Sequence, residues 1–148
     1  MTSLVILTSC KKQANEKDYL IFGHFYGECL GENCVEIFKL ESDRILEDEN
    51  DNYPKQETYY IGNFSELDKL KFEEIKDLLG FFPRDLLNES SSVIGQPDAG
   101  DWGGIYIEYN FNSVREFWLI DQMQSHIPTY LHEFVDKTNE KIELINNR

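Results

Sequence analysis

Positive charge is scarce in this 148-residue sequence, in which 28 Asp and Glu residues face only 14 Lys and Arg residues. Nucleic acids and anionic membrane surfaces are bound through clustered Lys and Arg side chains, so a net charge of −14 disfavours both as partners. The simplest interpretation of the acidity is that it keeps the protein soluble, and the alternative is an acidic recognition surface. We therefore predict that the chain binds no nucleic acid.

Short catalytic motifs are also missing. The sequence contains no glycine-rich phosphate loop, no Gly-x-Ser-x-Gly and no His-Glu-x-x-His, so nucleotide, serine-hydrolase and zinc-protease chemistry have no support. His126 and His132 are six residues apart, a spacing that does not place two metal ligands on one helical face. We therefore predict no catalytic residue, no metal site and no cofactor, and the sequence favours a non-enzymatic protein.

Long hydrophobic runs are absent, because no stretch approaches the roughly 20 apolar residues that span a bilayer. A short apolar run, Leu4–Leu7, instead leads into Leu7-Thr8-Ser9-Cys10 and then Lys11-Lys12. This junction resembles the lipobox of bacterial lipoproteins, especially those of Bacteroidetes-type bacteria. The resemblance implies cleavage before Cys10, lipidation of its thiol, and a lipid anchor as the only membrane contact. The alternative is an ordinary N-terminus in which Cys10 is a free thiol.

The segment after Cys10 indicates where the folded domain begins. Residues 11–18 are polar and charged without apolar periodicity, as expected of a tether. We therefore divide the chain into residues 1–18, a lipoprotein signal remnant and tether, and residues 19–148, a single domain. One core typically serves roughly 100–200 residues, and an apolar content of 41% is enough to form it.

The two remaining cysteines lie between two predicted strands, 19–26 and 34–40, which are rich in aromatic and β-branched residues. Cys29 and Cys34 are five positions apart around a glycine-containing turn, where facing strand ends bring two Cα atoms within reach of a disulfide. An exported protein would form this bond. Metal binding together with His24, or redox catalysis, is the alternative, although Cys-x4-Cys is not the usual Cys-x-x-Cys spacing.

The middle of the chain mixes short strands with an acidic run. Residues 44–46 and 57–61 are predicted strands, and the carboxylates of residues 47–52 between them indicate a solvated loop. Calcium also favours alternating carboxylates, but this run lacks the glycine and the final bidentate Glu of an EF-hand.

A central helix is predicted next. Ser65-x-x-Asp68 resembles a capping box, an apolar stripe follows it at helical spacing, and Gly80 ends it. A further short helix is expected with Pro83 near its first turn.

A long loop, 88–104, then collects Ser, Gly, Pro and Asp residues. Long loops on compact domains often carry binding residues, so Asp98, Asp101 and Trp102 form a possible binding loop. The alternative is structural: Trp102 covers the edge of the sheet, and the two aspartates make hydrogen bonds within turns.

The last third of the sequence predicts a hairpin followed by a helix. Two aromatic and β-branched runs, 105–109 and 115–120, are joined by a polar turn. The C-terminal helix has Pro128 in its first turn and an apolar face made of Tyr130, Leu131, Phe134, Val135, Thr138, Ile142 and Ile145. The element order predicts an α+β fold: an antiparallel sheet with the amphipathic C-terminal helix and the central helix packed on one face.

Two family resemblances extend beyond the lipobox. Segments 22–29, 103–108 and 117–121 resemble uncharacterised small lipoproteins of Bacteroidetes-type bacteria, which implies no activity. Pro97-Asp98, followed by the hairpin and by residues 127–131, resembles the order of elements in emfourin-type protease inhibitors.

These features together predict a lipid-anchored, non-enzymatic cell-envelope domain, in the periplasm or at the outer membrane. We expect it to bind an envelope protein or another envelope component. The alternatives are an inhibitor of a secreted metalloprotease and a hydrolase without a recognisable motif.

Overall fold

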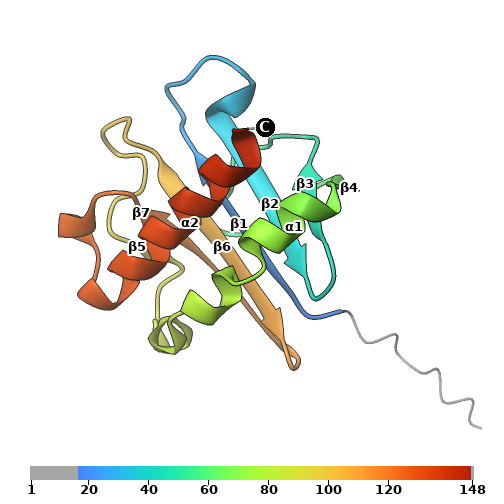
Figure 1. The fold of residues 1–148 in the computed structure, drawn as a ribbon. Helices are drawn as coiled ribbons and strands as arrows, with labels where there is room; N and C mark the ends of the chain where they lie inside the picture. The colour runs from blue at the N-terminus through green and yellow to red at the C-terminus, as the bar shows by residue number, and fades with distance from the viewer. Residues whose placement is uncertain (1–16, 148) are drawn as a thin grey trace, which may run out of the picture.

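The computed structural model describes residues 17–147 and shows a seven-stranded sheet with two α-helices on one face (Figure 1). The strands are β1 Tyr19–Phe25, β2 Val35–Glu41, β3 Ile45–Asp48, β4 Phe64–Glu66, β5 Val93–Ile94, β6 Gly104–Phe111 and β7 Val114–Asp121. Their order across the sheet is β4-β3-β2-β1-β6-β7-β5, and every neighbouring pair is antiparallel except β5 and β7. The predicted α+β fold with a mainly antiparallel sheet is confirmed.

β1 is the central strand, paired along its whole length with β2 on one side and β6 on the other. Its side chains alternate between the two faces, so Leu20 and Phe22 lie under the helices while Tyr19 and Ile21 lie on the opposite face. Gly23 is needed at the middle of the strand, because a Cβ atom there would lie 2.0 Å from the Glu36 carbonyl oxygen of β2.

The hairpin of β6 and β7 is confirmed, and both strands are longer than predicted. Asn112 and Ser113 form the turn with positive φ angles of 52° and 67°. Two consecutive left-handed residues give the type of turn whose twist matches that of the strands, and Asn adopts this conformation readily.

The helical layer contains α1 (Lys69–Ile75) and α2 (His132–Asn146), which cover the same face of the sheet as predicted (Figure 1). The short 3-10 helices are η1 Glu32–Cys34, η2 Leu78–Phe81, η3 Arg84–Asn88, η4 Gln124–His126 and η5 Thr129–Leu131. Pro83 is the N-cap of η3, and Pro128 is the N-cap of η5, which runs directly into α2. The buried side of α2 contains Phe134, Val135, Thr138, Lys141, Ile142 and Ile145.

The predicted limits of the central helix were wrong at both ends. Ser65 pairs with Glu47 in the sheet, so its backbone is unavailable to a helix. The N-cap is Asp68, whose carboxylate accepts hydrogen bonds from the N–H groups of the second and third helical residues. The helix ends at Ile75, and Gly80 lies inside η2 instead of ending α1.

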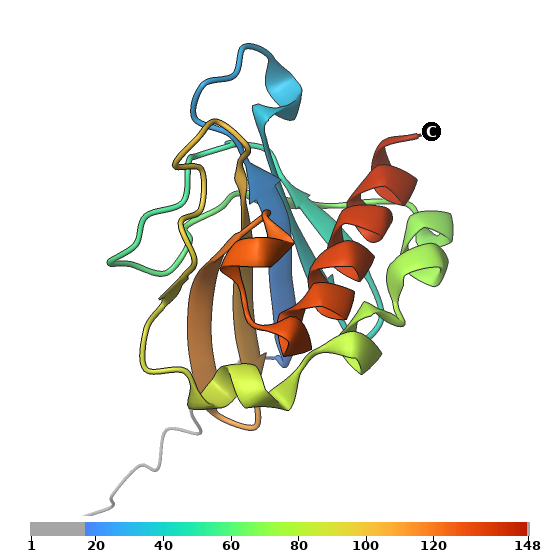
Figure 2. The same cartoon turned by 90° about the vertical axis from the view of Figure 1, so that its left-hand side faces the viewer.

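The predicted strand at residues 57–61 was also wrong. Residues 49–63 form an irregular segment that lies on the side of the sheet opposite α1 and α2 (Figure 2). Its aromatic side chains pack on a second, smaller core that includes Tyr19, Ile37 and Tyr106. The Tyr60 N–H group donates to the Tyr106 hydroxyl at 3.0 Å, a bond that takes the place of a strand ladder. Side-chain packing and hydrogen bonds to side chains replace strand pairing here.

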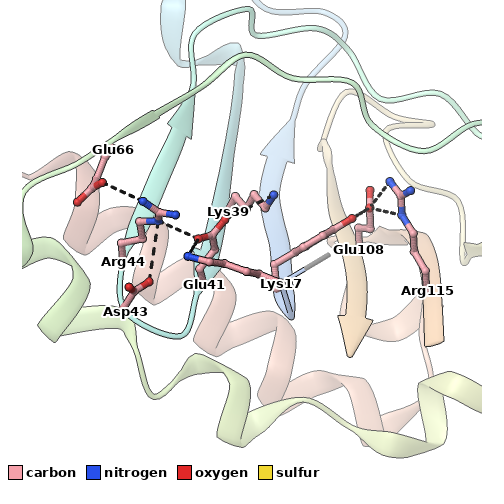
Figure 3. A network of polar contacts seen from close by, with 9 residues as sticks. Lys17, Lys39, Glu41, Asp43, Arg44, Glu66, Glu108 and Arg115 are labelled. Atoms are coloured by element: carbon pink, nitrogen blue, oxygen red, sulfur yellow. Dashed lines mark hydrogen bonds and ion pairs between the residues drawn. The ribbon is translucent and has the colours of Figure 1, made fainter. Parts of the chain in front are cut away.

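A buried carboxylate anchors this second face. The Glu108 side chain is fully buried and accepts hydrogen bonds from the Tyr19 hydroxyl at 2.7 Å and the Tyr106 hydroxyl at 2.8 Å. Arg115 on β7 forms an ion pair with Glu108 at 2.9 Å (Figure 3). The Tyr59 ring lies 4.1 Å from the guanidinium carbon of Arg115. Alternation along β6 places the Glu108 side chain on the face away from the helices. There it lies in a closed polar cluster and is not exposed to solvent.

Within residues 17–147, no helix is both long and apolar enough to cross a lipid bilayer. The lipobox and Cys10 lie outside the described residues.

Candidate functional site

The predicted binding loop lies at the end of the sheet where β1 and β7 end and β6 begins, next to the 26–34 loop (Figure 1). Asp98 fixes it there. The Asp98 carboxylate accepts hydrogen bonds from the Gly27 N–H at 2.7 Å, the Tyr53 hydroxyl at 2.9 Å and the Gly103 N–H at 3.0 Å. Burial, reinforced by Asp98, raises the pKa of Tyr53 to about 12, so this hydroxyl stays protonated and keeps donating. Asp98 is therefore a structural residue that joins three segments.

Trp102 is held by a different carboxylate. Its indole Nε1 donates to the Asp121 carboxylate at 2.8 Å, and its ring meets the His126 imidazole edge-on with 5.5 Å between centroids. Trp102 is half-buried, whereas Asp101 is exposed with a φ of 62°. The structure thus places the predicted residues in one loop but gives each a separate environment.

Asp121, at the end of β7, organises this region. Its fully buried carboxylate accepts four hydrogen bonds, each 2.8 Å long, from the Gln96 and Met123 N–H groups, Trp102 Nε1 and His126 Nδ1. Burial alone would raise the pKa of Asp121, but the hydrogen bonds outweigh burial and place the pKa below its usual value. The carboxylate is therefore ionised near neutral pH, and His126 Nδ1 is the hydrogen donor.

In many enzymes, a carboxylate bound to Nδ1 of a histidine orients the imidazole and leaves Nε2 available for catalysis. The Asp121–His126 contact has this arrangement. Here the same carboxylate also fixes an indole and two backbone N–H groups. Asp121 therefore acts as the organising centre of a rigid surface. We call this surface the Trp102 surface and define it as Asp101, Trp102, Met123 and His126.

The predicted disulfide between Cys29 and Cys34 is present, with 5.6 Å between the Cα atoms. The bond consumes both thiols, and His24 Nε2 instead contacts the Glu36 carboxylate at 3.0 Å. In this disulfide-bonded form, neither thiol is available as a metal ligand beside His24. The disulfide closes an exposed loop in which the Leu30 side chain is fully exposed.

The acidic run that also suited calcium is used for folding. Both oxygens of the buried Asp48 carboxylate are engaged, one by the Tyr60 hydroxyl and the Asp51 N–H, the other by the Asn63 N–H. Across the described residues, no group of three or more His, Cys, Asp or Glu side chains is arranged to hold a metal ion.

A polar cleft of about 420 Å³ opens on the helical side of the same end of the sheet. Its lining consists of His24, Tyr26, Gln122, Asn139, Ile142, Glu143, Asn146 and Asn147. The Tyr26 ring also supports the binding loop, because a Cβ atom on Gly103 would lie 2.3 Å from it. The cleft and the Trp102 surface therefore flank the same loop.

The opposite end of the sheet carries an apolar cavity of about 370 Å³. Leu20, Leu40, Phe72, Leu79 and Phe111 line it, with Asp18, Glu41, Ser42 and Lys76 as its polar residues. It lies between the sheet and the α1–η2 region, away from the predicted binding loop.

Known protein families and curated proteins offer no match to this chain. The site therefore has to be interpreted from its own geometry.

Sequence reasoning missed the organising role of Asp121 and the cleft residues. Asp121 is the last residue of β7, and its position at the end of an apolar run was a usable signal. Asn139 and Asn146 are seven positions apart, so they lie on one face of α2, and this spacing could have revealed a row of amide side chains.

Proposed function

We propose that this chain is a lipid-anchored, non-enzymatic domain of the bacterial cell envelope that binds an envelope protein or another envelope component through the Trp102 surface. The observation that carries the proposal is the disulfide between Cys29 and Cys34, in the 26–34 loop that contacts the binding loop at Asp98. Disulfides persist in oxidising compartments and are rare in the cytosol. Anchoring at Cys10 is supported by the lipobox-like sequence alone.

The Trp102 surface has properties that suit a binding site. Trp is enriched among residues that dominate binding energy, and Met is enriched at interfaces. Met123 is 42% exposed, and Trp102 presents an indole whose orientation Asp121 fixes. A surface that is already ordered loses little conformational entropy on binding. A partner would therefore meet a preformed aromatic and apolar patch.

The location can be tested by fractionating cells that express the full chain. We expect the protein in the membrane fraction, and we expect Cys10→Ser to release it. Ser9→Ala is the matched control, because it keeps a small residue in the lipobox and should remain with the membranes. Release of both variants, or of neither, would contradict lipid anchoring at Cys10.

Binding can be tested by cross-linking in intact cells. Asp101→Asn combined with Met123→Ala removes an exposed charge and an exposed thioether from the Trp102 surface. Asn tolerates the left-handed backbone at position 101, and the Asp121 hydrogen bonds stay in place. We expect this variant to lose cross-linked partners while keeping the thermal stability of the original chain. Leu144→Ala is the control, because Leu144 is 38% exposed on α2, an element outside the surface. Unchanged cross-links would refute the role of the Trp102 surface.

The alternative of a metalloprotease inhibitor is favoured by one observation, the rigid attachment of the binding loop through Asp98. Protease inhibitors generally present backbone that moves little on binding. Residual activity of a panel of secreted metalloproteases mixed with the full chain tests this alternative, and full activity throughout the panel would remove it.

A further inference from the structure

The polar cleft is built from three separate parts of the chain at one end of the sheet. His24 is the penultimate residue of β1 and Tyr26 follows that strand, Gln122 follows β7, and the remaining residues belong to the last three turns of α2 and its C-cap. Along β1, the even-numbered residues face the helices, so the side that buries Leu20 and Phe22 continues outward as His24 and Tyr26. The cleft is the polar continuation of the helix–sheet interface.

Carboxamides dominate this lining. Gln122, Asn139, Asn146 and Asn147 contribute four of the eight lining side chains, whereas Glu143 is the only carboxylate among them. This composition is unusual on a chain with twice as many acidic as basic residues. A carboxamide carries two N–H donors and a carbonyl acceptor, so neighbouring amides present alternating donors and acceptors without net charge.

Hydrogen bonds hold these amides in place. Asn139 Nδ2 donates to Gln122 Oε1 at 3.0 Å, and Asn146 Nδ2 donates to the Glu36 carboxylate at 2.6 Å. Glu36 is itself fixed by His24 at 3.0 Å. In the described part of the chain, Gln122 Nε2, Asn139 Oδ1 and Asn146 Oδ1 have no hydrogen-bond partner. The cleft therefore offers a ligand one amide nitrogen with two N–H donors, and two carbonyl oxygens as acceptors.

An aromatic ring and an aliphatic side chain complete the lining. Tyr26 is half-buried and meets the His24 ring edge-on, with 5.2 Å between centroids. Burial, followed by the charges of Asp98 and Glu36, raises the pKa of Tyr26, so its hydroxyl remains a donor at neutral pH. Ile142 adds a buried apolar contact to the same cleft.

We propose that this cleft binds a neutral oligosaccharide. A sugar ring presents neighbouring hydroxyl groups that both donate and accept, and carboxamides match such groups with either role. Its C–H face is apolar and packs against an aromatic ring such as Tyr26. Phosphorylated or acidic glycans are disfavoured by Glu143 in the cleft and by the net charge of −14.

A peptide ligand fits the cleft less well. Peptides commonly bind by adding a strand to a sheet edge or by placing apolar side chains in a groove. β1 is paired on both sides, so the cleft has no free strand edge, and Ile142 is its only aliphatic residue. The proposal goes beyond the envelope function, because the cleft is distinct from the Trp102 surface and does not depend on Cys10.

The test is a titration of the full, disulfide-bonded chain followed by NMR of side-chain amide signals. The probes are maltohexaose, cellohexaose and chitohexaose, with an oligogalacturonate and an uncharged peptide as comparison ligands. We expect at least one neutral oligosaccharide to shift the Gln122, Asn139 and Asn146 amide signals in a saturable way. Saturable binding of only the peptide or the oligogalacturonate, or of none of the probes, would overturn the proposal.

Variants locate the binding. Asn139→Ala and Gln122→Ala should each weaken the oligosaccharide about tenfold, the effect expected for loss of one or two hydrogen bonds. Gln124→Ala is the matched control, because the Gln124 amide bonds to Asp136 and lies outside the cleft. Thermal unfolding of each variant separates lost binding from lost folding, and equal affinity in all three variants would refute the cleft as the site. This titration does not depend on membrane anchoring. A failure of the oligosaccharide proposal can therefore be told apart from a failure of the proposed anchoring.

Discussion

The two faces of the central sheet are stabilised in different ways. The face under α1 and α2 is covered by a continuous apolar core that includes Phe22, Ile107 and Phe134. The opposite face carries three buried carboxylates, Asp48, Glu108 and Asp121, which accept hydrogen bonds from tyrosine hydroxyls, an indole, an imidazole and backbone N–H groups.

The difference follows from what covers each face. A helix satisfies its own backbone hydrogen bonds and needs only apolar contacts from the sheet. Irregular segments such as 49–63 and 95–104 leave backbone and side-chain donors unsatisfied, and buried carboxylates accept from them. The second face therefore combines less apolar burial with a rigid polar framework, and that framework positions the Trp102 surface.

The largest effect is expected from the apolar face. Phe134 is 1% exposed and packs edge-on against Phe82 with 5.6 Å between ring centroids. Phe134→Ala should lower the free energy of unfolding by about 3–5 kcal/mol, because it removes apolar burial and leaves a cavity. Urea unfolding measures this loss. A change below about 1 kcal/mol would show that packing of the helices on the sheet contributes little to stability.

The second face should depend on the charge of its carboxylates. Glu108→Gln keeps the shape of the side chain but replaces one oxygen of a carboxylate that accepts from two tyrosine hydroxyls and one guanidinium. We expect a loss of about 2 kcal/mol in urea unfolding. Glu116→Gln on the same hairpin is the control, since Glu116 is exposed and should change stability by less than about 0.5 kcal/mol. Equal effects of the two substitutions would contradict the polar framework.

The disulfide supports the loop beside the Trp102 surface. Replacing Cys29 and Cys34 with Ser should lower the free energy of unfolding by about 2 kcal/mol, because the short loop gains conformational freedom mainly in the unfolded chain. Differential scanning calorimetry of the original and double-variant chains measures the effect. Identical melting temperatures would show that the bond has no role in stability.

The smallest expected effect is a pH dependence from Asp121. The pKa of Asp121 is lower in the folded protein than in the unfolded chain. Its contribution to the free energy of unfolding is therefore complete above the usual Asp pKa of about 4. This contribution is lost as the pH falls through the lower pKa of the folded protein. Asp121→Asn should flatten the acid side of the stability curve, because the substituted side chain does not titrate. An unchanged curve would mean that the Asp121 hydrogen bonds add nothing to stability.

The sequence predicted those parts of the fold that local patterns determine. Alternating aromatic and β-branched residues identified the hairpin, helical spacing identified α2, and cysteine spacing identified the disulfide. The prediction of a strand at 57–61 was wrong because a segment that packs on a sheet can be as rich in aromatic residues as a strand within the sheet. The predicted start of α1 was wrong because Ser65 pairs with Glu47 in the sheet, and this pairing outweighed the capping signal.

The candidate site was predictable only in part. Trp102 and Asp98 stood out in their loop, and Asp98 accepts the hydrogen bond within the turn that the structural alternative describes. Glu108 could not be recognised, because a lone acidic residue in a strand normally faces solvent and only distant donors make its burial favourable. Those donors come from segments far apart in the chain.

We propose that the domain works outside the cytosol, attached by lipid at Cys10. The most direct measurement is the intact mass of the full chain purified from membranes of a host with lipoprotein processing, before and after reduction. We predict a chain that begins at Cys10 and carries added acyl mass. On reduction, its mass should rise by that of the hydrogen atoms added to one disulfide. An unmodified chain that keeps residues 1–9 and shows no mass change on reduction would contradict the account.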